Sequence, residues 1–224
     1  MQPVAVVPLN LGVVKAFVIK GERSILVDAG NAGDARKIIQ GLTRLKINPQ
    51  DLSLIIITHS HSDHIGGLAK LKEVTGARVL VHQLDAEALV AGINKDIIPT
   101  NFKGDLFKRF IEERPKIKTV EPDILIDGEH DLQKYGVAGK VIGTPGHTAG
   151  SISIVLENGE AIIGDLLMGG LILQRFPSYP YFAYNLDLVK ESIKKLQKLD
   201  LKKLYPSHGG PFAFHAVKKR FADC

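Results

Sequence analysis

The chain has 224 residues, 45% of them hydrophobic, which is enough to bury the core of one domain spanning residues 1–224. No apolar run approaches the roughly 20 residues that cross a bilayer, and the first residues do not resemble a signal peptide, so we expect a cytoplasmic protein without a membrane partner. The net charge is +5, but the lysines are spread over expected helix faces, which argues against a nucleic-acid partner. The single cysteine, Cys224, excludes an intrachain disulfide.

Strands and helices are expected to alternate along the chain. Runs of apolar and β-branched residues predict strands, whereas apolar residues that recur every three or four positions predict helices. Strands are expected at 4–8, 13–20, 24–28, 54–57, 78–81, 124–127, 132–135, 140–143, 152–156 and 161–164. Helices are expected at 34–45, from near 65, at 85–91 and at 186–199. Strands clustered in both halves, with helices between and outside them, predict an α/β fold and fit a four-layer αββα sandwich.

The most informative segment follows the apolar run 54–57, where three imidazoles and a carboxylate occur within six residues. Alternate side chains of an extended segment project the same way, so His59 and His61 can reach one metal ion. Asp63 and His64 then turn toward a second point beyond it. A solvated, histidine-rich loop is the alternative interpretation. The position at the carboxyl end of an apolar strand favours a metal site.

Three further candidate ligands lie in similar settings. His147 follows Pro145 and Gly146 in a turn between two expected strands. Asp165 closes the apolar run 161–164, and His208 precedes a pair of glycines. Each has glycine or proline nearby, where the backbone can fold closely around an ion. We therefore count all three as metal ligands.

The pattern H-x-H-x-D-H, followed by a distant His, an Asp and a final His, resembles the metallo-β-lactamase fold superfamily, and the resemblance covers nearly the whole chain. It implies the αββα fold and a site for two metal ions. The segment Asp28-Ala29-Gly30 also matches a feature of the family, which implies that Asp28 hydrogen-bonds a ligand. The implied ligands are His59, His61 and His147 for the first ion, Asp63, His64 and His208 for the second, and Asp165 for both.

Imidazole and carboxylate ligands suit Zn²⁺, the favoured ion, and also Fe²⁺ or Mn²⁺. Two divalent ions that share a bridging hydroxide can attack a carbonyl or phosphoryl centre. Asp63 is expected to act in catalysis, orienting this nucleophile as well as binding metal. We therefore expect a dinuclear metal-dependent hydrolase that acts on an ester-like bond (thioester, lactone or ester) of a small-molecule metabolite.

Two other functions stay open on the same ligands. A mononuclear iron enzyme resembling persulfide dioxygenases would use His59 or His61 with His147 and Asp165. A phosphodiesterase or nuclease is less favoured, because those relatives add an arm or a second domain. The ligand set also resembles that of glyoxalase II, but only a short segment follows His208, so we do not expect the glutathione-binding C-terminal domain or its specificity for glutathione thioesters. Quorum-lactone hydrolases of the family carry a tyrosine where this chain has Met168, so a lactonase of that kind is disfavoured.

Two segments are expected near the substrate. The aromatic segment 171–184 contributes four candidate substrate-binding residues, Tyr179, Tyr181, Phe182 and Tyr184. The segment 92–120 places Phe107, Phe110 and Ile111 on one helical face, as core or as a lid over the site. Asp85 is interpreted as a helix cap or turn residue. A homo-oligomer is compatible with the sequence but is not indicated by it.

Overall fold

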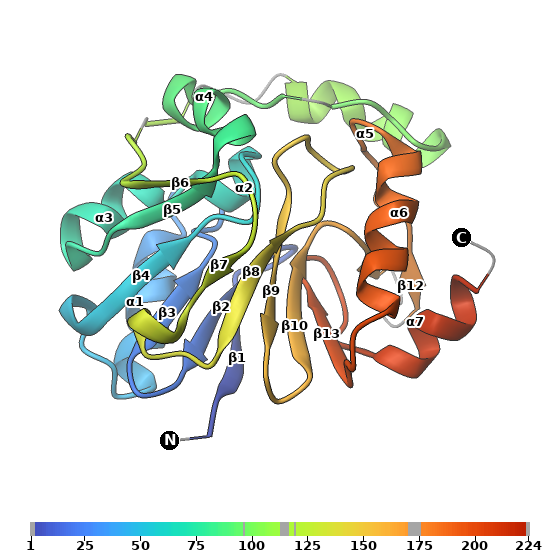
Figure 1. The fold of residues 1–224 in the computed structure, drawn as a ribbon. Coiled ribbons are helices and arrows are strands. Elements are labelled where there is room, and N and C mark those ends of the chain that lie inside the picture. The colour runs from blue at the N-terminus through green and yellow to red at the C-terminus, as the bar shows by residue number, and fades with distance from the viewer. Residues whose placement is uncertain (1–2, 96, 113–116, 119, 170–175, 223–224) are drawn as a thin grey trace.

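Two six-stranded sheets lie face to face, with helices on their outer sides (Figure 1). The computed structural model describes residues 3–95, 97–112, 117–118, 120–169 and 176–222, without the side chains of residues 109–112. This arrangement confirms the predicted αββα sandwich. Within the described residues no helix is long and apolar enough to cross a membrane. Cys224 and the side chains of Phe110 and Ile111 lie outside the described part of the chain.

The first sheet has the order β1-β2-β3-β4-β5-β6. Its first three strands are antiparallel, joined by short turns, whereas β3 to β6 run parallel because helices return the chain across the sheet. The strands are β1 (Ala5–Asn10), β2 (Lys15–Lys20), β3 (Ser24–Val27), β4 (Leu52–Ile56), β5 (Val79–His82) and β6 (Ile124–Ile126). The helices of this half are α1 (Ala35–Arg44), α2 (Ser62–Ile65), α3 (Leu68–Thr75), α4 (Gln83–Ala91) and α5 (Phe102–Glu112), with a 3₁₀ turn at Pro49–Asp51.

The second sheet has the order β14-β13-β10-β9-β8-β7. All neighbours in it are antiparallel except β10 and β13, so β8, β10 and β13 point the same way. Its strands are β7 (His130–Asp131), β8 (Gly139–Gly143), β9 (Ile152–Leu156), β10 (Glu160–Gly164), β13 (Lys203–Pro206) and β14 (Phe212–Ala213). Helices α6 (Leu186–Gln197) and α7 (Phe214–Arg220) accompany it, and β11 (Met168–Gly169) pairs with β12 (Pro177–Ser178) in a separate small sheet.

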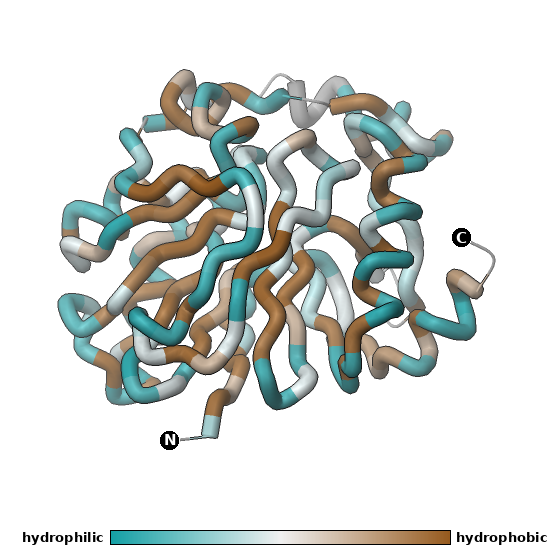
Figure 2. The backbone as a smooth tube through the Cα atoms, viewed as in Figure 1, coloured by the Kyte–Doolittle hydropathy of each residue, from teal (hydrophilic) through white to brown (hydrophobic). Residues whose placement is uncertain are grey.

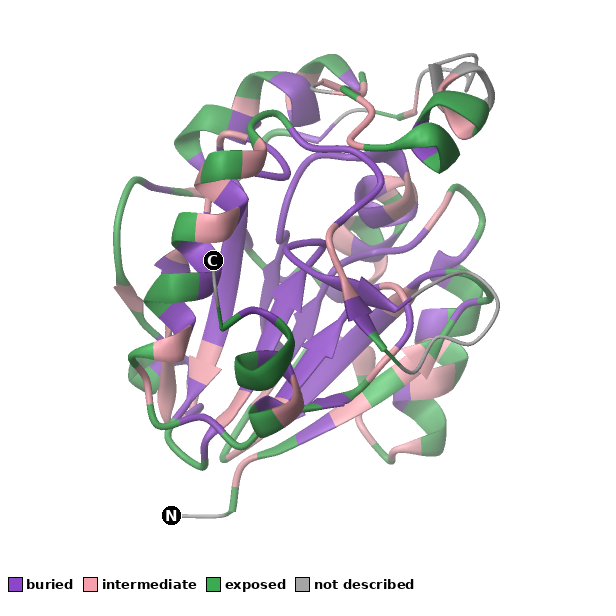
Figure 3. Cartoon of the chain, turned by 90° about the vertical axis from the view of Figure 1, so that its right-hand side faces the viewer, coloured by how far each residue is buried: buried purple, intermediate pink, exposed green. Residues whose placement is uncertain are grey.

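The central strands are apolar on both faces, as the brown strands in Figure 2 and the buried strands in Figure 3 show. Side chains alternate across a strand, so Leu54 and Ile56 of β4 join the core between the two sheets. Ile55 packs on the other face, under α1 and α3. The second sheet repeats this pattern, because Ile162 faces the first sheet and Ile163 packs toward α6. Because both faces of these strands are buried, the strands are held firmly in place, and so are the residues that directly follow them.

The expected elements match except in a few places. The strand expected at 132–135 is wrong, because Gln133–Tyr135 form a 3₁₀ turn between β7 and β8. Leu132 and Tyr135 are both buried, and their spacing of three residues is that of a turn rather than of a strand. One helix was expected from near residue 65, but the chain forms α2 and α3 there. The short elements β7, β11, β12, β13, β14 and α7 were not predicted.

Polar segments follow the carboxyl ends of several strands, on the same side of the two sheets. In the first sheet Asp28 follows β3 and the segment from Thr58 follows β4, and these two strands run parallel. In the second sheet His147, Asp165 and His208 follow β8, β10 and β13. The backbone N–H of Ile152 donates to the carbonyl of Thr58 at 3.0 Å and thereby joins the two edges.

Candidate metal centre

Three imidazole nitrogens meet at the edge shared by the two sheets. Nε2 of His147 lies 3.1 Å from Nε2 of His59 and 2.9 Å from Nδ1 of His61. All three residues are buried, with exposed fractions of 1% for His59, 5% for His61 and 3% for His147. His59 and His61 follow β4, whereas His147 comes from the turn after β8, so each sheet contributes to this group.

The second ring nitrogen of each of these histidines is held by an oxygen. Nε2 of His61 lies 2.7 Å from the carbonyl of Lys95, and Nδ1 of His147 lies 2.7 Å from the carbonyl of Phe182. A carbonyl only accepts, so these nitrogens carry the proton. Nδ1 of His59 similarly faces the hydroxyl of Thr58 at 3.1 Å. The hydroxyl of Thr58 donates its proton to Asp28, so it accepts from Nδ1 of His59. In the neutral rings, the three nitrogens that face one another therefore all carry lone pairs.

A second group surrounds Asp165. Nε2 of His208 lies 3.3 Å from Oδ2 of Asp63 and 3.3 Å from Oδ2 of Asp165. Nε2 of His64 lies 3.6 Å from Oδ1 of Asp165 and 3.9 Å from Oδ2 of Asp63. Oδ2 of Asp165 is also 3.7 Å from Nε2 of His147, so this carboxylate lies between the two groups.

Asp28 holds His64 from behind. Its Oδ2 lies 2.8 Å from Nδ1 of His64 and accepts from the hydroxyl of Thr58 at 2.8 Å, while its Oδ1 accepts from the backbone N–H of Thr58. Asp28 has a φ of 63°, a left-handed conformation that residues other than glycine rarely adopt. These bonds stabilise that conformation. Nδ1 of His208 is held in a similar way by the carbonyl of Val13, at 2.8 Å.

Two observations indicate that this set of donor atoms fits divalent cations. First, Nε2 of His64 and Oδ1 of Asp165 are buried without a hydrogen-bond partner among the described residues, which is costly unless something binds them. Second, bonds of about 2.1 Å to a tetrahedral ion would place neighbouring ligand atoms roughly 3.4 Å apart. The separations given above run from 2.9 Å to 3.9 Å. The candidate groups are His59–His61–His147, His59–His64–Asp165 and Asp63–His64–His208.

The two groups differ in charge. Burial lowers the pKa of His147 to about 3, and it also lowers the pKa of His59. Burial would lower the pKa of His208 as well, but the ion pairs with Asp165 and Asp63 outweigh it and raise that pKa to about 10. Asp165, together with Asp28 and Asp63, likewise raises the pKa of His64 against its burial. In the metal-free protein, protons on His64 and His208 balance the carboxylates, and a divalent cation can take their place.

The second group is the more accessible one. The side chains of Asp63 and His208 are 20% and 18% exposed, whereas that of His64 is 0% and that of Asp165 is 7% exposed. The exposed pair lies next to the turn between β1 and β2, where the side chain of Val13 is 65% exposed. Asp63 and His208 are therefore the predicted ligands that solvent reaches most easily.

The four candidate substrate-binding residues lie in different surroundings. Tyr179 packs edge-on against Phe221 at a ring distance of 5.0 Å, beside the outer core of the second sheet. Tyr181 and Phe182 are buried in a small cluster with Met168, and Tyr184 is 46% exposed. The hydroxyl of Tyr181 has no hydrogen-bond partner among the described residues. Residues 171–175 of the same segment lie outside the described chain.

The groups that orient the rings were not predicted from the sequence. The carbonyls of Val13, Lys95 and Phe182 carry no signal in the sequence, since every residue has a carbonyl. Asp85 was interpreted as a cap, but its carboxylate accepts from the backbone N–H of Ser60 at 2.7 Å, inside the motif that carries His59 and His61. The structure brings all seven predicted ligands together, and their binding to metal remains a prediction.

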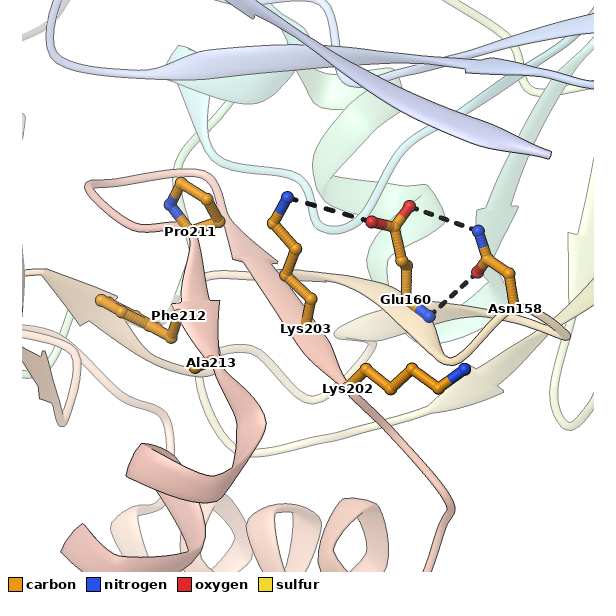
Figure 4. Close-up of a pocket in the computed structure, with 7 residues that line it drawn as sticks. All are labelled: Asn158, Glu160, Lys202, Lys203, Pro211, Phe212 and Ala213. Atoms are coloured by element: carbon orange, nitrogen blue, oxygen red, sulfur yellow. Dashed lines mark hydrogen bonds and ion pairs between the residues drawn. The ribbon is translucent and has the colours of Figure 1, made fainter. Parts of the chain in front are cut away.

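A separate pocket lies at the opposite end of the second sheet. Glu160 begins β10, whose other end delivers Asp165, so the pocket and the candidate centre are separated by the length of that strand. Glu160 contacts Lys203 and Asn158 there (Figure 4). The pocket, of about 380 Å³, shares no residue with the candidate centre and is lined by Asn158, Glu160, Lys202, Lys203, Pro211, Phe212 and Ala213.

Known proteins share both the sequence pattern and the fold. Residues 9–208 match the family model of the metallo-beta-lactamase superfamily. A probable metallo-hydrolase of Methanocaldococcus jannaschii is 30% identical over 199 residues, which is 87% of this chain and 86% of that protein. A hydroxyacylglutathione hydrolase of Albidiferax ferrireducens is 30% identical over 133 residues, 59% of this chain and 38% of that protein.

Solved structures agree with the architecture. The metallo-beta-lactamase SMB-1, bound to 2-mercaptoethanesulfonate, superposes with a TM-score of 0.69 over 91% of this chain and 77% of that chain, at 20% identity. At that identity the likeness shows the fold. The family match spans most of the chain and includes the segments that carry every predicted ligand. The chain therefore belongs to the metallo-beta-lactamase superfamily of metallo-hydrolases, with His/Asp groups suited to divalent metal ions.

Proposed function

We propose that the protein is a dinuclear metal-dependent hydrolase that cleaves an ester-like bond of a small metabolite. The observation that carries this proposal is the pair of ligand groups joined by Asp165, whose carboxylate faces His147 on one side and His64 and His208 on the other. One buried carboxylate between two sets of imidazoles suits two cations better than one.

Each group would hold one ion. His59, His61 and His147 would hold the first, and Asp63, His64 and His208 the second, with Asp165 shared. When bound, two divalent ions, for which Zn²⁺ is our first choice, supply Lewis-acid chemistry that polarises a substrate carbonyl and lowers the pKa of water toward about 7. The rings are held for this task by the oxygens behind them, so little rearrangement is needed on binding.

The chain's own residues would guide the reaction. Oδ2 of Asp63 faces His208, which leaves Oδ1 to accept a hydrogen bond from the attacking water and to orient it. Tyr181 lies directly before Phe182, whose carbonyl orients His147. We propose that its unpaired hydroxyl donates a hydrogen bond to the substrate.

The ester-like class rests on the donor set and on a relative. The centre has no need of a serine or cysteine nucleophile, which suits direct attack of water on a carbonyl. The Albidiferax ferrireducens relative is named for cleaving hydroxyacylglutathione, and this chain spans 38% of it, so the thioester class is carried over only as a candidate for testing. Lactones and oxygen esters complete the panel.

The first test is metal content. Protein produced without metal supplementation is analysed for its elements, and about two zinc or manganese ions per chain are expected. About one iron per chain would instead favour the persulfide dioxygenase-like alternative and would call for an oxygen-uptake assay. A chain that retains no metal after reconstitution would contradict both.

The second test is a substrate panel of thioesters, lactones, oxygen esters and phosphodiesters, each with and without a chelator. We expect chelator-sensitive turnover of at least one carbonyl ester class. Turnover confined to phosphodiesters would refute the ester-like assignment while leaving the metal centre in place. An Asp123→Asn variant serves as the control, because Asp123 binds Lys72 and Val79 away from the centre.

A further inference from the structure

Asp85 is a buried carboxylate that the proposed reaction does not use. It lies in the first turn of α4, is 3% exposed, and accepts hydrogen bonds from three uncharged donors among the described residues. A buried charge without a partner of opposite sign is costly unless several hydrogen bonds satisfy it. The hydrogen bonds around Asp85 therefore indicate its role.

The carboxylate joins two loops that come from different sheets. Oδ2 accepts from the backbone N–H of Ser60 at 2.7 Å, between His59 and His61. The same oxygen accepts from the hydroxyl of Thr148 at 3.0 Å, next to His147. Oδ1 accepts from the backbone N–H of Gly150 at 3.0 Å.

Gly150 shows how closely the second loop approaches. A Cβ at this position would lie 2.5 Å from Oδ1 of Asp85 and 2.8 Å from its backbone nitrogen. A side chain at residue 150 would therefore push the loop of His147 away from α4. The residue must be glycine for the carboxylate to reach both loops.

We propose that Asp85 is a positioning residue that sets the separation between His147 and the pair His59 and His61, and thereby the affinity of this group for its cation. The inference rests on the proposed metal centre. Nε2 of His147 lies 3.1 Å from Nε2 of His59 and 2.9 Å from Nδ1 of His61, across the junction that Asp85 spans. A shift of a few tenths of an ångström between the loops would spoil that geometry, because ligand distances tolerate only about 0.2 Å.

Replacing Asp85 should loosen this junction without separating the sheets. The bond from Ile152 to the carbonyl of Thr58, at 3.0 Å, joins the same two edges independently. In an Asp85→Asn variant the shape is kept, but one arm becomes an NH₂ donor. That donor would face either Ser60 and Thr148 or Gly150, which are themselves donors.

The test is a competitive titration of Zn²⁺ against a chromophoric chelator, comparing wild type with Asp85→Asn. The tighter ion should bind about 10- to 100-fold more weakly in the variant, as is typical when a group that orients a ligand is lost. Asp123→Asn is the matched control, because Asp123 also accepts from a backbone N–H, that of Val79 at 2.8 Å, and should leave the affinity unchanged. The visible spectrum of the Co²⁺-loaded protein should shift in Asp85→Asn only, which a general loss of stability would not produce.

A gentler variant, Thr148→Val, removes one of the three donors and keeps the size of the side chain. It should weaken the affinity less than Asp85→Asn does, and it decides the matter if Asp85→Asn does not fold. Wild-type affinity and an unchanged Co²⁺ spectrum in the folded variants would overturn the positioning role while leaving the proposed function standing. Failure of the wild type itself to bind Zn²⁺ would overturn both.

Discussion

The two ligand groups are built differently although Asp165 joins them. The first group, His59, His61 and His147, is buried, and burial lowers the pKa of two of its members. In the second group, Asp63, His64 and His208, nearby carboxylates raise the pKa values of both histidines. The side chains of Asp63 and His208 are also partly exposed. The first is thus ready to bind a cation, whereas the second must release protons as it binds one.

Under the proposed function, this contrast would separate two tasks in one centre. The buried group with fixed rings would retain its ion, and the accessible group would exchange ligands with solvent and substrate. Variants of single residues test whether the two groups are as separate as their surroundings indicate.

The largest effect is expected from Asp165→Ala, because this residue faces both groups. Turnover should fall by more than the roughly 100-fold typical of residues that only orient a ligand. Elemental analysis should show the loss of at least one ion per chain, with Asp123→Asn as the control. Undiminished turnover with full metal content would refute the bridging role.

A pair of variants should separate the groups. His208→Ala removes a ligand at the accessible side and should leave about one tightly bound ion per chain, held by the first group. His147→Ala removes a ligand from the buried group and should abolish that tight binding. Metal titration of both proteins measures this. Equal losses in the two variants would show that the groups bind as one unit.

The metal-free protein should respond to pH in opposite ways at the two groups. The pKa of His208 is raised from 6.5 to about 10, so its contribution to stability is complete below pH 6.5 and is lost as pH rises toward 10. The pKa of His147 is lowered from 6.5 to about 3, so the folded state loses stability as pH falls below 6.5. Denaturant unfolding across this range checks both limbs. His64, whose pKa is also raised, should leave a smaller alkaline limb in His208→Ala, so a limb of undiminished size in that variant would contradict the assignment.

The smallest effect is expected from Tyr181→Phe, which removes a buried hydroxyl without a described partner. The free energy of unfolding should rise by about 1 kcal/mol, because that hydroxyl is unsatisfied. Turnover should fall with metal content unchanged if the hydroxyl binds substrate as proposed. Tyr205→Phe is the control, since its hydroxyl donates to Glu160 at 2.8 Å and its loss should lower stability instead. Unchanged kinetics in Tyr181→Phe would remove it from the substrate site.

Much of the fold could be predicted because apolar runs at the periods of strands and helices are local signals. The run 54–57 and the helix at 186–197 are of this kind. Elements defined by partners rather than by their own residues were missed, such as β11 and β12, which exist only as a pair. The buried spacing of Leu132 and Tyr135 was misread because four residues cannot distinguish a turn from a strand.

The sequence alone determined which side chains are available for metal binding, because imidazoles and carboxylates placed after apolar strands have few other uses. The tertiary structure decided how they are held. The acceptors of His61, His147 and His208 are carbonyls 34, 35 and 195 residues away, and no local pattern reveals them. Asp85 looks like an ordinary helix residue until the sheets bring Ser60 and Thr148 to its carboxylate. These contacts form only in the folded chain, where two sheets packed face to face bring the ends of their strands together, because the partners are distant in the sequence.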